Sequence, residues 1–352
     1  MLSIDIILTL QIIADSRNKR QLVKAVYEAD FKKITGLQPL LAFTKKYIAP
    51  DATYTTVETA LAQAQKIKAD SRSNNIHIIT PDDIHFPPSL KVIDSPPVLL
   101  FAKGDLSSLT SGMTVVIIGT REVSPFGAEM SKNIARQLAL RGITIVSGLA
   151  LGSDTAAHQG CLEERGKTIA VLAHGLKMVY PHQNERLANE IVRSGGCLLS
   201  EYTPDVRPTI YSFVERDRLQ SGLSHGVIVI ESAVSGGAMH TAHFAQAQSK
   251  RLACVKHPSD FPERYPAYKS NTAGNALLLK EGAFQLESLD SLPNFVSELE
   301  RPNLKRERSD DKTHKSSPVT KKSCRATVFS DSDRRIPREN QPSQTTLDSF
   351  LR

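Results

Sequence analysis

The turn at Gly119, Thr120 and Arg121 is the part of this sequence best suited to bind an anion. It follows an apolar run, 114–118, and precedes an amphipathic segment, 128–140. Glycine permits a tight turn, the free N–H groups at a helix start attract an anion, and a guanidinium offers phosphate a planar fork of donors. We therefore predict a phosphate site here, against the alternative of an ordinary turn with a solvated arginine.

Two further arginines, Arg216 and Arg218, flank Asp217 in the segment 213–218. Guanidinium groups at this spacing could contact a phosphodiester backbone. A local ion pair with Asp217 that fixes the loop is an equally good interpretation. Both interpretations stay open on the sequence alone.

Two other glycine-bearing turns follow apolar runs. The first contains Ser147 and Gly148, with Asp154 and His158 further along the chain. We expect Asp154 to cap the following helix and to place His158 one turn further on the same face. A His–Asp pair can act as a general acid–base, but the sequence indicates no nucleophile, so we predict no catalytic residue.

The second turn contains Gly236 and Gly237, before a helix predicted to begin at Thr241, and is a second candidate anion site. His240 and His243 are three residues apart, a spacing that would suit a shared metal ion. Because the sequence indicates no third ligand, we predict no metal site.

Apolar runs that alternate with amphipathic segments must position these turns. The runs typical of buried strands are 114–118, 143–146, 168–172, 197–200, 226–231 and 251–256. The segments with helical spacing between them are 128–140, 156–165, 184–194 and 241–249. This order predicts an α/β fold with a doubly wound, mostly parallel Rossmann-like sheet, in which ligands bind beyond the carboxyl ends of the strands. The patterns G-x-G-x-x-G and G-x-x-x-x-G-K-[ST] are absent from the sequence, so we predict neither NAD nor ATP, and no other cofactor.

Composition divides the chain into three predicted regions: a small helical region at 1–75, the Rossmann-like domain at 76–290 and a disordered basic tail at 291–352. Residues 301–352 carry 13 Lys and Arg against 7 Asp and Glu, which accounts for +6 of the formal net charge of +7. No apolar run reaches the ~18 residues of a membrane helix. The four cysteines are far apart in the sequence. We therefore expect a cytoplasmic protein with no membrane partner.

Taken in order from Ile78 to Arg251, these motifs resemble the DprA/Smf family of DNA-processing proteins, within the Rossmann-like group that includes the LOG-type enzymes. The stretches that carry the resemblance are Gly119-Thr120-Arg121, Ser147-Gly148-Leu149-Ala150 through Asp154 and His158, Leu199-Ser200-Glu201-Tyr202, and Arg216-Asp217-Arg218. Asp217 stands where the family has Asn, and Gly236 and His240 depart from the family pattern S-G-S-L-I-T-A. The chain is thus identified as a divergent member of the family.

The resemblance implies a non-enzymatic protein that binds single-stranded DNA and helps to load a RecA-type recombinase in natural transformation and DNA recombination, usually as a homodimer. It implies a basic pocket for the strand, lined by the three arginines and by the loops at Gly148 and Gly237. It assigns Asp154, His158 and Glu201 to holding that pocket in shape. The alternative is a nucleotide sensor or a phosphoribohydrolase of the LOG-like kind, whose P-G-G-x-G-T-x-x-E pattern is incomplete here.

The last residues of the chain are similar to the peptides that dock on DNA sliding clamps of the eukaryotic and archaeal type, Q-x-x-[LIM]-x-x-[FY]-[FY]. Gln344, Leu347 and Phe350 match this motif, and Leu351 stands where a second aromatic residue is usual. One helical turn would place Leu347 and Phe350 on one face, which suits an apolar groove. The chain could therefore be a clamp-associated adaptor, and chance apolar residues at a terminus are the alternative.

Overall fold

The computed structural model describes residues 4–14, 18–28, 31 and 34–301. The compact unit that contains them runs from Met1 to Arg301. The sliding-clamp motif and residues 302–352 of the predicted basic tail lie outside the described residues, so both stay predictions. Among the described residues, no helix combines the length and apolar composition that crossing a membrane requires.

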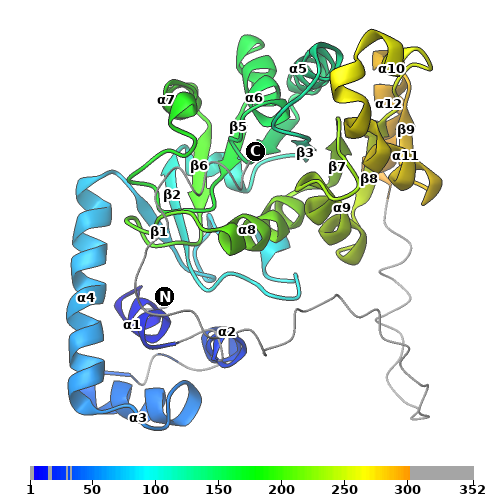
Figure 1. Cartoon of the computed structure of the whole chain (residues 1–352). Coiled ribbons are helices and arrows are strands. Elements are labelled where there is room, and N and C mark those ends of the chain that lie inside the picture. The colour runs from blue at the N-terminus through cyan, green and yellow to red at the C-terminus, as the bar shows by residue number, and fades with distance from the viewer. Residues whose placement is uncertain (1–3, 15–17, 29–30, 32–33, 302–352) are drawn as a thin grey trace, which may run out of the picture. The chain divides into compact units, whose positions relative to one another are not determined.

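A nine-stranded sheet forms the centre of the described structure (Figure 1), with the strand order β1-β2-β6-β5-β4-β3-β7-β8-β9. Its strands are β1 (His77–Ile79), β2 (Leu100–Gly104), β3 (Thr114–Ile118), β4 (Thr144–Ser147), β5 (Thr168–Val171), β6 (Cys197–Ser200), β7 (Gly226–Val229), β8 (Arg251–Val255) and β9 (Phe284–Leu286). The pairs β1–β2 and β2–β6 are antiparallel, and the other six pairs are parallel. The predicted mostly parallel sheet is therefore confirmed.

Twelve helices are described in addition to short 3-10 turns. They are α1 (Ile4–Ile13), α2 (Lys19–Glu28), α3 (Leu37–Tyr47), α4 (Tyr54–Ser73), α5 (Pro125–Ala139), α6 (Ser153–Glu163), α7 (Glu185–Arg193), α8 (Ile210–Leu223), α9 (Ala238–Ala247), α10 (Phe261–Arg264), α11 (Ala273–Lys280) and α12 (Leu292–Glu300). Helices α5, α6 and α12 pack on one face of the sheet, and α8, α9 and α11 pack on the other. Covering both faces explains why strands such as β3 and β7 are buried at every residue.

The order of the parallel strands reverses beside β3. Strands β4, β5 and β6 follow on one side of it, and β7 and β8 on the other. In a doubly wound sheet, ligands bind beyond the carboxyl ends of the strands at this switch point. The loops after β3 and β7, which contain the predicted anion sites, are therefore neighbours.

The N-terminal helices α1 to α4 pack at the β2 end of the sheet. Ile7 and Leu10 of α1 belong to one apolar cluster with Phe101 of β2 and with Leu99, the residue before that strand. The hydroxyl of Tyr27 also donates to the carbonyl oxygen of Pro97 at 3.0 Å. The first region is helical, as predicted, and shares its core with the sheet.

Two segments differ from the prediction. Residues 213–218 belong to α8 and do not form a loop. Helix α12 extends the ordered structure past residue 290, because Leu292, Phe295 and Leu299 are buried against the sheet.

Candidate functional site

The start of α5, where we predicted a phosphate, already holds a carboxylate of the chain itself. The backbone N–H of Ser124, the N-cap residue, donates to Glu231 Oε2 at 3.0 Å, and the Ser124 hydroxyl donates to Glu231 Oε1. Glu231 follows β7 and is completely buried. Burial alone would raise the pKa of Glu231, but the neighbouring His257, whose Nε2 lies 3.6 Å from Oε1, and the hydrogen bonds from Ser124 outweigh burial and leave the pKa below its ordinary value. The negative charge of Glu231 therefore interacts favourably with the positive end of the α5 dipole. In this loop, Thr120 and Arg121 are partly exposed and can contact a ligand.

Arg121 lies beside aromatic rings at the carboxyl edge of the sheet. Its half-buried guanidinium lies 5.2 Å from the ring centroid of Phe213, on α8, in a cation–π contact. The Phe213 ring lies 5.9 Å from that of Tyr180, which follows β5. Tyr211, two residues before Phe213, is 83% exposed. The guanidinium of Arg121 and the partly exposed rings of Phe213 and Tyr180 are thus grouped at this edge.

Arg216 is buried and bonded within the fold. Its Nη1 donates to the carbonyl oxygens of Gly148 at 3.0 Å and of Val171 at 2.5 Å, and its Nε donates to Asp217 Oδ1 at 3.1 Å. A Cβ on Gly148 would overlap the guanidinium, so a larger residue here would have to displace the bonded Arg216 side chain. Arg216 thus ties together the ends of β4 and β5.

Arg218 is also buried and points away from Arg216, since residues two apart on a helix do not share a face. Its Nη2 donates to Glu201 Oε2 at 2.6 Å, and its Nη1 to the carbonyl oxygen of Glu215 at 3.3 Å. These ion pairs favour the second interpretation of residues 213–218, in which the arginines fix the local structure. Arg216 pairs with Asp217, and Arg218 pairs with Glu201. Of the three predicted arginines, Arg121 alone keeps a partly exposed side chain.

Asp154 does not cap α6, and that prediction was wrong. The N-cap residue is Gly152, and the Asp154 carboxylate instead accepts from the upstream N–H groups of Gly148 at 3.0 Å and Ala150 at 3.2 Å. Burial raises the pKa of Asp154 despite the neighbouring charge of Arg216. Burial likewise raises the pKa of Asp217 to about 7, against the same guanidinium. Two buried carboxylates therefore share one arginine beneath the Gly148 loop.

His158 is buried and neutral. Its Nδ1 lies 2.7 Å from the Thr168 hydroxyl, which itself donates to the carbonyl oxygen of Ile145 at 3.0 Å. Nδ1 must therefore carry the imidazole proton and donate it to Thr168. Burial lowers the pKa of His158 to about 3. The side chain has the geometry of a structural group and not of a general acid–base.

The loop after β7 exposes Gly237 at the start of α9, where the N–H groups of Met239 and His240 donate to the carbonyl oxygens of Gly236 and Gly237 at 3.0 Å. Gly237, the N-cap residue, is exposed, and a Cβ on it would meet no atom within 4 Å. Gly236 packs against Ser232, and Thr241 is buried one turn into the helix, which begins at Ala238 and not at Thr241. Within the described residues, no group of three or more His, Cys, Asp and Glu side chains is placed to bind a metal ion.

A backbone hydrogen bond also joins the loops at the switch point: the N–H of Thr120 donates to the carbonyl oxygen of Glu231 at 2.8 Å. The fold and this edge together define a doubly wound α/β protein whose candidate site combines a guanidinium, aromatic rings and an exposed glycine at a helix start.

Residues 77–297 match the family model described as DNA recombination-mediator protein A. The chain belongs to this DprA/Smf family. It is 37% identical to Protein Smf of Escherichia coli over 209 residues, which cover 59% of this chain and 54% of that protein. It is 31% identical to the DNA processing protein DprA of Bacillus subtilis over 253 residues, which cover 72% of this chain and 82% of that protein. The chain thus spans about half of the length of the first relative and most of the second.

Two solved structures are similar to this one. The X-ray structure of DprA from Streptococcus pneumoniae matches 83% of this chain and 98% of that chain, with a TM-score of 0.67 and 28% identity. A structure of DprA from Helicobacter pylori, titled for its single-stranded DNA binding mode, matches 63% of this chain and 95% of that chain, with a TM-score of 0.54 and 31% identity.

Sequence reasoning missed Phe213, Tyr180 and Glu231 as residues of this edge. An acidic residue at the end of the buried run 226–231 is a signal that could have pointed to Glu231. The rings carry no such signal, because the contact between Arg121 and Phe213 joins residues far apart in the chain.

Proposed function

We propose that this chain binds single-stranded DNA at the sheet edge formed by Arg121, Phe213 and the loop at Gly237. The observation that carries the proposal is the pairing of Arg121 with the Phe213 ring. Proteins that bind single strands without sequence preference combine cations for the backbone with aromatic faces on which bases stack. The partly exposed Tyr180 ring extends the same platform, and the exposed Gly237 leaves room for a phosphate at the start of α9.

The DNA-binding mode named for the Helicobacter pylori relative supports this proposal. The buried Arg216 and Arg218 act in it indirectly, because they hold the Gly148 loop and Glu201 in place. Membership in a family of recombination mediators supports a second step: a homodimer of this chain helps to load a RecA-type recombinase onto the bound strand. In this role the protein is non-enzymatic.

The test is a salt titration of binding to an oligo-dT, followed by fluorescence anisotropy. Arg121→Ala should weaken binding and flatten the salt dependence by about 0.7 in the log–log slope for each phosphate that the variant no longer neutralises. The matched control is Arg141→Ala, because Arg141 is exposed and precedes β4, at the opposite edge of the sheet. If Arg121→Ala and Arg141→Ala have equal affinity and slope, the site is not at this edge.

A further inference from the structure

Two carboxylates and one guanidinium are buried together below the proposed DNA edge. Asp154, Arg216 and Asp217 are each at most 7% exposed. Arg216 Nε donates to Asp217 Oδ1 at 3.1 Å, and the charge of Arg216 also acts on Asp154. With both acids ionised the cluster carries one negative charge in excess, and an uncompensated buried charge is costly. The arrangement therefore favours one proton on the pair of carboxylates, which titrate as a unit.

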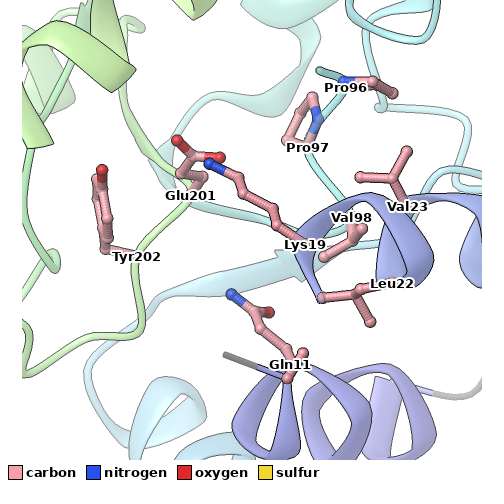
Figure 2. Close-up of a pocket in the computed structure, with 10 residues that line it drawn as sticks. Gln11, Lys19, Leu22, Val23, Pro96, Pro97, Val98, Glu201 and Tyr202 are labelled. Carbon is pink, nitrogen blue, oxygen red and sulfur yellow. The ribbon is translucent and has the colours of Figure 1, made fainter. Parts of the chain in front are cut away.

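The charged and titratable groups described around this carboxylate pair are themselves balanced or neutral. Arg218, the next residue of α8, is paired with Glu201. Figure 2 shows Glu201 with Tyr202 at a cavity of about 240 Å³ on the chain that follows β6. Burial raises the pKa of Tyr202 and lowers that of His174, so both are neutral. From α9, the hydroxyl of Thr241 hydrogen-bonds the Asp217 carboxylate. The excess charge therefore belongs to the carboxylate pair.

The carboxylate pair is close to both helices of the proposed DNA edge. Asp217 follows Phe213 by four residues on the same face of α8, about 6 Å further along the helix axis. Its partner Thr241 follows Gly237, the N-cap residue of α9, by four residues. A charge on the pair therefore acts on a bound phosphate through the protein interior, where screening is weak.

The same pair holds the backbone of the Gly148 loop. The N–H of Gly148 donates to Asp154 Oδ2 at 3.0 Å and to the amide oxygen of Gln220 at 2.8 Å. The amide nitrogen of Gln220 donates to Asp217 Oδ1 at 3.1 Å. A protonated Asp217 becomes a donor, which favours the opposite orientation of the Gln220 amide and withdraws its oxygen from Gly148. The protonation state of the pair is thus linked to the bonding of this loop.

We propose that Asp154 and Asp217 form a proton-binding pair that controls the affinity of this chain for single-stranded DNA. This inference rests on the proposed function. Uptake of a proton removes a negative charge below the strand, so the protonated pair binds DNA more tightly, and by linkage DNA binding draws in a proton. Because burial raises the pKa of Asp217 to about 7, the exchange takes place near neutral pH. The family has Asn at this position, which does not titrate.

The test is calorimetry of oligo-dT binding to the full chain near pH 7, in two buffers with different ionisation enthalpies. The difference in heat gives the number of protons taken up on binding. The unchanged protein should take up a larger fraction of a proton than Asp217→Asn does. The exposed His240 and His243 of α9 are present in both proteins, so their contribution cancels in this comparison. Asp51→Asn, at an exposed residue before α4, is the matched control and should behave like the unchanged protein.

Affinity should show the same link. Between pH 6 and pH 8 the unchanged protein should lose about threefold more affinity than Asp217→Asn, the scale of one partly screened charge near a phosphate. Asp154→Asn is a second variant in case Asp217→Asn does not fold, since it also leaves one carboxylate with one guanidinium.

The outcomes separate this inference from the proposed function. Equal proton uptake by the unchanged protein and Asp217→Asn, or an affinity loss in the variant that is the same at both pH values, overturns the inference. If Arg121→Ala still weakens binding in that case, the DNA edge stands without the proton-binding pair. A difference in uptake without any effect of Arg121→Ala would support the pair and move the strand away from Arg121.

Discussion

The guanidinium of Arg121 lies 5.2 Å from the centre of the Phe213 ring, at the carboxyl edge of the sheet. Arg121 comes from the loop after β3 and Phe213 from the first turn of α8. The contact therefore joins the side chain that we propose for phosphate binding to a ring that we propose for base stacking. It defines the edge to which we assign the DNA strand.

The first prediction concerns that ring. Replacing Phe213 by Leu should lower oligo-dT affinity by about 1–3 kcal/mol, because one stacked base loses its aromatic face. Phe213→Tyr keeps a ring and should bind nearly as well as the unchanged protein. Equal weakening in both variants, measured by anisotropy, would mean that shape at residue 213 matters and stacking does not.

The second prediction concerns Asp217, which stands among buried arginines. Its pKa of about 7 in the fold lies above the ordinary value near 3.9, so the folded protein binds more protons than the unfolded chain between these values. The stability that the protonated Asp217 side chain contributes is therefore fully present below about pH 4. As pH rises to about 7 and beyond, this contribution is lost, and the free energy of unfolding falls by up to ~4 kcal/mol.

Asp217→Asn removes this titration. Urea unfolding between pH 5 and pH 8 should show stability falling with pH in the unchanged protein and a flatter profile in the variant. Parallel profiles for the two proteins would show that Asp217 keeps an ordinary pKa.

The third prediction compares two glycines. Gly148→Ala should destabilise the fold by about 1–3 kcal/mol, because the added Cβ would overlap the Arg216 guanidinium. Gly237→Ala should change the free energy of unfolding by less than about 0.5 kcal/mol, since a Cβ there meets no atom within 4 Å and the backbone φ is −56°. Similar urea midpoints for the two variants would contradict the packing of Arg216 beneath Gly148.

The fourth prediction concerns the sliding-clamp motif, which rests on the sequence alone. A peptide of residues 340–352 should bind a purified clamp of the eukaryotic or archaeal type, and a Phe350→Ala peptide should bind at least about tenfold more weakly, because it lacks the aromatic anchor. Calorimetry with both peptides decides the matter. Indistinguishable titrations would leave the adaptor hypothesis without support.

Much of the sheet could be predicted from the sequence, since continuous Val and Ile runs such as 114–118 and 226–231 are typical of buried parallel strands. Helix α8 could not, because it buries Arg216, Asp217 and Gln220 and so lacks the apolar spacing of an ordinary helix. A polar helix inside a fold is stabilised by long-range partners, and these are visible only once the chain is folded.

The candidate site was predicted in outline and not in detail. The switch-point loops and Arg121 followed from the order of strands and glycines. The occupation of the α5 start by Glu231 did not, because a carboxylate more than a hundred residues away satisfies that helix. The sequence also could not show that Arg216 and Arg218 are buried, since exposed and buried arginines have the same local pattern.

Photo-crosslinking of the full chain to an oligo-dT that carries iodouracil bases tests the central claim most directly, because iodouracil crosslinks to the aromatic side chains on which it stacks. We predict that mass spectrometry will find the crosslink at Phe213 or Tyr180 and that Arg121→Ala will reduce its yield. Crosslinks confined to residues 302–352, with none at the Arg121–Phe213 edge, would contradict the account.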